Sequence, residues 1–84
     1  MTKPANGHEE IAAEVPVSDT KKIAVRIGVS KSGAGYVDVR QMYKNDESDP
    51  DWAFGKGIRF HEEKLESVIA ALENANDKMT AWYA

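Results

Sequence analysis

The clearest pattern along the chain is a strict alternation of apolar and polar residues over residues 22–30. The apolar members of this run are Ile23, Val25, Ile27 and Val29. Alternation of β-branched residues with a period of two predicts a strand with one buried face. A turn with two glycines follows at residues 31–35, and the alternation resumes over residues 36–43. The two runs predict an antiparallel β-hairpin.

The register of this hairpin has two candidate values. The apolar faces of the two strands must coincide, which fixes the parity of the pairing. A turn centred on Gly33 places Val29 opposite Val37 and Arg26 opposite Arg40. Like charges directly opposite each other destabilise a sheet unless an anion lies between them, and a shift of two residues separates them. The first register is the expectation, and the shifted one stays open.

The segments on either side of the hairpin are less regular. Residues 1–13 are expected to form a flexible tail, and residues 14–19 a short strand that Pro16 confines to a sheet edge. An acidic loop at residues 45–51 precedes a further strand that is clearest over residues 57–61.

A helix is predicted over residues 62–76 by apolar residues at i, i+3, i+4 and i+7. These four residues, which form either core or dimer interface, are Leu65, Val68, Ile69 and Leu72. Residues 77–84 are expected to be a C-terminal tail, either loose or docked. The folded domain therefore spans residues 14–76.

Size and composition favour self-association. About 60 of the residues are expected to fold, and a domain of that length buries only about 60% of its unfolded surface. The sequence has no cysteine, which excludes disulfides and thiolate zinc sites as added stabilisation. We therefore expect a homodimer. No apolar run approaches the roughly 18 residues that span a bilayer, and no signal peptide is evident, so we expect no membrane association.

Catalytic chemistry has little support in the sequence. His8 and His61 are the two histidines, and each is followed by two glutamates. One imidazole with neighbouring carboxylates lacks the three or four convergent ligands of a zinc site. The glycine pairs near positions 33 and 55 are too short for a phosphate-binding loop. We expect no enzyme activity, no metal and no cofactor.

The distribution of charge is more informative than its sum. The formal net charge is −3, yet the predicted sheet segments 21–44 and 54–60 contain eight Lys or Arg residues and only one acid, Asp38. Such a sheet, apolar on one face and basic on the other, predicts a surface for a polyanion. Asp38 is expected to pair with Arg26 or Arg40. Aromatic residues in the same region favour single-stranded nucleic acid, whose bases are free to stack.

Particular motifs resemble a known family. The segment Tyr-Val-Asp-Val-Arg at residues 36–40, an acidic Asp-Pro loop, and Gly-Lys-Gly-Ile at residues 55–58 before a helix resemble the transcriptional positive cofactor four (p15) coactivator family. The resemblance covers roughly residues 15–76. It implies an α+β fold in which a four-stranded antiparallel twisted sheet precedes one C-terminal helix, and homodimers joined through the helices. It also implies single-stranded DNA binding with little sequence preference.

The resemblance assigns roles residue by residue. Arg40 and Lys56 correspond to basic residues of the family motifs, and Tyr43 to an aromatic residue that stacks on bases. Together with the charge pattern this gives the candidate DNA-binding residues Lys22, Arg26, Lys31, Arg40, Tyr43, Lys44, Trp52, Lys56 and Arg59.

The predicted function is sequence-nonspecific binding of single-stranded DNA in transcription, replication, recombination or repair, with transcription or replication proteins as further partners. The alternatives are a protein–protein interaction module and an RNA-binding protein. The missing basic N-terminal region of eukaryotic members favours a bacterial or viral relative. The expected location is accordingly the cytoplasm or nucleoid, the host cytoplasm for a viral protein, or the nucleus for a eukaryotic one.

Overall fold

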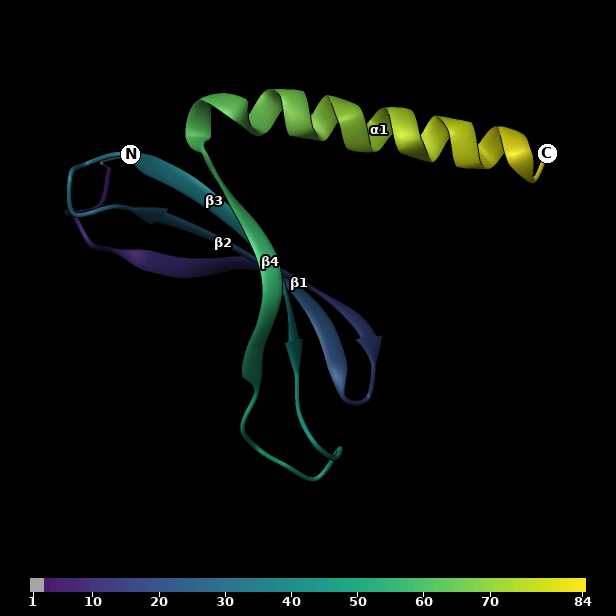
Figure 1. Ribbon diagram of the computed structural model, residues 1–84, viewed down its shortest axis with the longest axis horizontal. Coiled ribbons are helices and arrows are strands. Elements are labelled where there is room, and N and C mark those ends of the chain that lie inside the picture. The colour runs from purple at the N-terminus through teal and green to yellow at the C-terminus, as the bar shows by residue number, and fades with distance from the viewer. Residues whose placement is uncertain (1–2) are drawn as a thin grey trace.

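The computed structural model describes residues 3–84, which form one antiparallel sheet and one helix. The strands follow one another in chain order: β1 (Glu9–Ser18), β2 (Lys21–Val29), β3 (Gly35–Tyr43) and β4 (Ala53–His61). A short 3-10 turn (Glu62–Lys64) leads into α1 (Leu65–Trp82). Figure 1 shows a strongly twisted sheet from which α1 projects away instead of lying across it. The predicted fold class is confirmed.

The β2–β3 hairpin forms as predicted, in the alternative register. Ile27 pairs with Val37 and Arg26 with Asp38, so the expected pairing of Arg26 with Arg40 is wrong by two residues. The turn between the strands is closed by hydrogen bonds from Ser30 N to Ala34 O (2.8 Å) and from Gly33 N to Ser30 O. A shift of two residues keeps the apolar faces matched and replaces an opposition of like charges with an ion pair.

Strand β1 begins earlier than the sequence indicated. It starts at Glu9, so residues 9–13, expected in the flexible tail, are paired with β2. Apolar residues at positions 11, 13, 15 and 17 continue the alternation upstream, a signal weakened by the apolar Ala12 and by the acidic pair Glu9 and Glu10 before it. The strand is an edge strand, as Pro16 predicted, and its pairing is irregular between Ile11 and Ala13.

The helix is longer than expected. It continues to Trp82, so six residues assigned to the C-terminal tail are helical. Met79 lies seven residues after Leu72 and extends the apolar stripe by two turns. At the start of the 3-10 turn, Nδ1 of His61 accepts a hydrogen bond from the Glu63 backbone N–H (3.2 Å).

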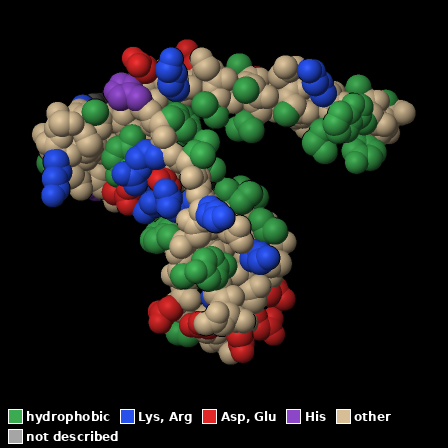
Figure 2. All heavy atoms as spheres, viewed as in Figure 1, with side chains coloured by type: hydrophobic (Ala, Val, Ile, Leu, Met, Phe, Trp, Pro, Cys, Tyr) green, Lys and Arg blue, Asp and Glu red, His purple; other side chains and the backbone are tan. Residues whose placement is uncertain are grey.

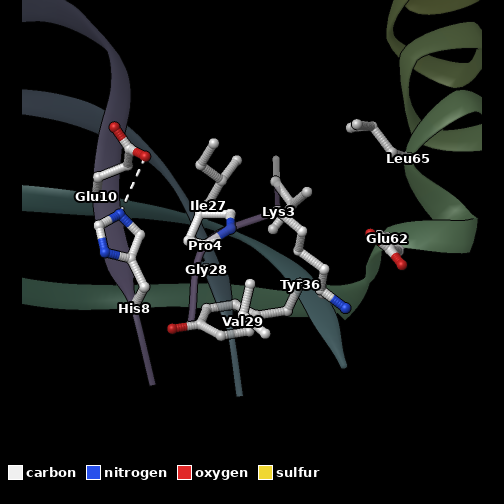
Figure 3. A pocket seen from close by; sticks show the side chains of 12 residues that line it. Lys3, Pro4, His8, Glu10, Ile27, Gly28, Val29, Tyr36, Glu62 and Leu65 are labelled. Carbon is white, nitrogen blue, oxygen red and sulfur yellow. Dashed lines mark hydrogen bonds and ion pairs between the residues drawn. The ribbon is translucent and has the colours of Figure 1, made fainter. Parts of the chain in front are cut away.

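One face of the sheet is apolar and largely uncovered. We call the face that carries Ile23, Val25, Ile27, Val37, Val39 and Ile58 the apolar face. Within residues 3–84 no element lies over it, and Ile27 and Ile58 are 42% and 63% exposed. A cavity of about 250 Å³ lies at the end of this face nearest α1, between Ile27, Val29 and Leu65 (Figure 3). The sheet therefore exposes apolar surface that a partner would bury.

No helix in the described part of the chain is both long and apolar enough to cross a lipid bilayer.

Candidate nucleic-acid interface

The opposite face of the sheet, here called the polar face, is ordered in rows that run across the strands. In one row Ile11, Arg26, Asp38 and Arg59 stand side by side on the four strands. The row above contains Glu9, Gly28, Tyr36 and His61, and the row below contains Glu14, Ala24, Arg40 and Gly57. Strand pairing thus gathers residues from positions 9 to 61 onto one surface.

Asp38 is the centre of this surface. Its side chain is completely buried and accepts two hydrogen bonds from Arg40, from Nε and Nη2, at 2.6 Å each. Arg26 Nη2 lies 3.3 Å from one carboxylate oxygen, and Arg59 Nε donates to the other at 3.2 Å. The hydrogen bonds from Arg40 lower the pKa of Asp38 from 3.8 to about 2, against the opposing effect of its burial. The carboxylate therefore stays ionised and fixes three guanidinium groups.

A glycine permits the close approach of Arg40 to β4. A Cβ added to Gly57 would collide with the Arg40 Cβ and with the Val39 carbonyl oxygen. The absence of a side chain at this position lets β3 and β4 pair tightly beneath the Arg40 guanidinium. The Gly-Lys-Gly motif thus has a packing role in addition to any contact with a ligand.

Glu9 supplies a second carboxylate to the cluster. Its Oε1 lies 2.6 Å from Arg26 Nη1, and its Oε2 accepts hydrogen bonds from Tyr36 OH (2.5 Å) and Arg59 Nη2 (3.3 Å). The hydrogen bond to Glu9 raises the pKa of the Tyr36 phenol, which keeps the hydroxyl a donor. We call Arg26, Arg40, Arg59, Asp38 and Glu9 the arginine cluster.

The sequence predicted a basic face, but in the structure several of its cations form ion pairs with carboxylates of the same chain. Three guanidinium groups share two carboxylates in the arginine cluster, and Lys22 pairs with Glu14 at 2.6 Å. The polar face keeps an excess of positive charge, but a smaller one than the residue count of the strands suggests. Figure 2 shows basic and acidic side chains together on the upper half of the sheet. The predicted pairing of Asp38 with Arg26 or Arg40 is confirmed.

A second group of cations surrounds an aromatic ring at the other end of the polar face. The ammonium nitrogens of Lys22 and Lys44 lie 4.3 Å and 4.8 Å from the centre of the Trp52 ring. Nearby, the Arg26 guanidinium lies 4.4 Å from the Phe54 ring, which is half exposed. Cations held against aromatic faces are stabilised by the ring quadrupole. Phosphate-binding and base-stacking groups therefore lie next to each other.

Three candidate residues lie apart from these two groups. Lys31 is exposed in the β2–β3 turn, and Lys56 is exposed on β4 where the pairing with β3 is irregular. Tyr43 pairs with Lys21 and Ala53 and shares the face of Val37 and Val39, opposite to Arg40. Tyr43 and Arg40 therefore lie on opposite faces of the sheet, and the role of each in DNA binding stays a prediction.

Sequence reasoning missed Glu9 and underrated Tyr36. Arg59 stacks on the Tyr36 ring, with its guanidinium carbon 4.1 Å from the ring centre. Tyr36 reaches Glu9 across Gly28, where a Cβ would collide with the ring. The strand alternation places residues 28 and 36 on one face, but the strand predicted over residues 14–19 does not include Glu9.

In the described residues, no group of three or more His, Asp or Glu side chains is arranged to hold a metal ion. His8 Nε2 lies 3.1 Å from Glu10 Oε1 as an isolated contact on the surface.

These observations define a small antiparallel-sheet protein with a projecting helix and one face bearing cations and aromatic rings. Comparison with solved structures finds the crystal structure of BPSL1147, a PC4 homolog from Burkholderia pseudomallei K96243, with a TM-score of 0.70 and 28% identity. The match covers 87% of this chain and 96% of that one. No protein-family model and no curated protein matches the chain. The predicted resemblance to the positive cofactor four family is confirmed by this bacterial neighbour.

Proposed function

We propose that the protein binds single-stranded DNA along the polar face of its sheet, as a homodimer. The observation that carries the proposal is the combination of cations with aromatic rings on that face. Both Lys22 and Lys44 contact the Trp52 ring, and Phe54 lies against Arg26. Lysine and arginine neutralise phosphates, while flat rings stack on unpaired bases whatever their sequence. The similarity to a PC4 homolog supports the same conclusion.

The shape of the surface favours a single strand over a duplex. Duplex readers insert a helix or a β-ribbon into a groove, but α1 has Glu66 in its first turn and no basic residue in its last turn, and it leaves from one end of the sheet. An open sheet face lined with rings offers stacking partners that a duplex, with its bases paired, does not use. Transcription, replication, recombination and repair are the processes that expose such strands.

Uncovered apolar surface supports the homodimer. In the isolated chain Ile69 and Leu72 on α1 are 46% and 66% exposed, and Ile27 and Ile58 on the apolar face are 42% and 63% exposed. Within residues 3–84 only four apolar side chains are buried, namely Ala24, Val29, Val37 and Met42. A second copy that packs its helix and apolar face against the first would supply the missing core.

Truncation of Trp52 tests the stacking role directly. Trp52→Ala should weaken binding of oligo-dT by about 5- to 150-fold, because the loss of one base–aromatic stack costs about 1–3 kcal/mol. The measurement is a fluorescence-anisotropy titration with a labelled oligonucleotide.

Tyr83→Ala is the matched control, since Tyr83 is a highly exposed aromatic residue beyond the end of α1. It should bind like the unmodified protein. Equal affinities for Trp52→Ala and Tyr83→Ala would contradict the proposed role of Trp52.

A further inference from the structure

The Glu9 carboxylate is held as a bound anion would be. Its donors come from three different strands: Arg26 on β2, Tyr36 on β3 and Arg59 on β4. Two guanidinium groups and a phenol are the kinds of donor that bind phosphate oxygens in protein–DNA complexes. Glu9 belongs to β1, the one strand of the sheet that supplies none of these donors, so the protein fills the anion position with its own carboxylate.

The three donors are positioned without help from Glu9. Asp38, which is fully buried, binds Arg26 and Arg59 through other guanidinium nitrogens, Nη2 and Nε, at 3.3 Å and 3.2 Å. Tyr36 lies across Gly28 and beneath the Arg59 guanidinium. An anion that replaced the Glu9 carboxylate would therefore find the same donors in place, already oriented.

Unused donor capacity remains in the cluster. The Nε of Arg26 is buried and has no hydrogen-bond partner among the described residues, although buried N–H groups are nearly always satisfied. Three guanidinium groups facing two carboxylates also leave one positive charge in excess. The cluster is thus arranged for more negative charge than the chain itself provides.

Glu9 can leave without unfolding the sheet. Its side chain is 31% exposed, and it belongs to the edge strand. The backbone beside it is tied to β2 by hydrogen bonds from Gly7 N to Val29 O (2.7 Å) and from Val29 N to His8 O (2.8 Å). Rotation of the Glu9 side chain about its own torsions would vacate the position while β1 stays paired.

We infer that Arg26, Tyr36 and Arg59 form a phosphate-binding subsite that the Glu9 carboxylate occupies in the free protein. A backbone phosphate of the bound strand displaces this carboxylate, so Glu9 competes with DNA and sets its affinity. The inference rests on the proposed function, because it assigns a regulatory residue to the same polar face.

Removal of the Glu9 charge tests this competition. Glu9→Gln should bind oligo-dT on the order of tenfold more tightly than the unmodified protein, since DNA no longer displaces a charged competitor. The slope of log K against log salt should be about the same in both proteins, because the same phosphate occupies the subsite in each. Both quantities come from anisotropy titrations at two or more salt concentrations.

Glu10→Gln is the matched control. It removes the same charge from the adjacent residue of β1, which pairs with Ile27 on the apolar face and whose side chain, within residues 3–84, is hydrogen-bonded only to His8. Glu9→Ala is the second variant, in case a glutamine at this position perturbs folding, and circular dichroism verifies the fold of each chain.

Tighter binding by Glu9→Gln or Glu9→Ala than by Glu10→Gln would support the inference. Equal binding by all three variants and the unmodified protein would overturn it and leave the proposed function standing. Absence of salt-sensitive binding by every chain would overturn the proposed function, and the inference with it.

Discussion

Asp38→Asn should lower the free energy of unfolding by about 3 kcal/mol or more, because it removes the buried carboxylate that three arginines share. Loss of one partner from a buried ion pair leaves uncompensated charge, a change that typically costs about 3–5 kcal/mol. Small domains have only about 5–15 kcal/mol of stability in total. Urea denaturation followed by circular dichroism, at one fixed protein concentration, measures the effect.

The control for this substitution is Asp51→Asn, which removes a carboxylate from the exposed loop before β4. It should leave the urea midpoint nearly unchanged. A midpoint for Asp38→Asn equal to that of Asp51→Asn would show that the arginine cluster contributes nothing to stability.

The ion pairs of Asp38 also predict how the stability of the protein depends on pH. The folded-state pKa of Asp38 is lowered from 3.8 to about 2, so its stabilising effect is complete above about pH 4 and is lost as the pH falls toward 2. A shift of this size corresponds to about 2 kcal/mol. Asp38→Asn should lack this part of the acid-induced loss.

Leu72→Asp should convert the proposed dimer into a monomer, with the dissociation constant raised by at least about 100-fold. Leu72 lies in the middle of the apolar stripe of α1 and is 66% exposed in the isolated chain. A carboxylate there would be buried without a partner at the interface between helices, which costs several kcal/mol. Light scattering or sedimentation across a range of concentrations measures the mass.

Ala70→Asp is the comparison for this variant. Two residues of an α-helix turn through about 200°, so Ala70 lies on nearly the opposite side of α1 and is exposed. The same charge there should leave the dimer intact. A monomeric unmodified protein, or a dimeric Leu72→Asp variant, would contradict the proposed assembly.

Alternation predicted the central hairpin, but not its exact register. A period of two fixes which residues share a face, and this places Arg26, Asp38 and Arg40 together in either register. It does not distinguish pairings that differ by two residues. The observed register pairs Arg26 with Asp38 and avoids placing Arg26 opposite Arg40. This preference depends on contacts between strands, which a pattern within one strand does not report.

Glu9 shows why the rest of the site could not be predicted. Its three donors lie 17, 27 and 50 residues away in the sequence, and no local pattern connects them. Only the pairing of β1 with β2, which depends on weak alternation around charged residues and on an irregularity near Ala12, brings Glu9 to the polar face. A surface that looked purely basic in the sequence is therefore partly neutralised in the fold.

Titration of labelled oligo-dT, oligo-U and a matched DNA duplex with the unmodified protein, each at two salt concentrations, tests the central proposal most directly. We expect the protein to bind oligo-dT more tightly than the duplex, with an affinity that falls steeply as salt rises. Comparable binding of oligo-U would place RNA among its ligands. Failure to bind either single strand in a salt-sensitive way would contradict the account and favour a protein–protein interaction module.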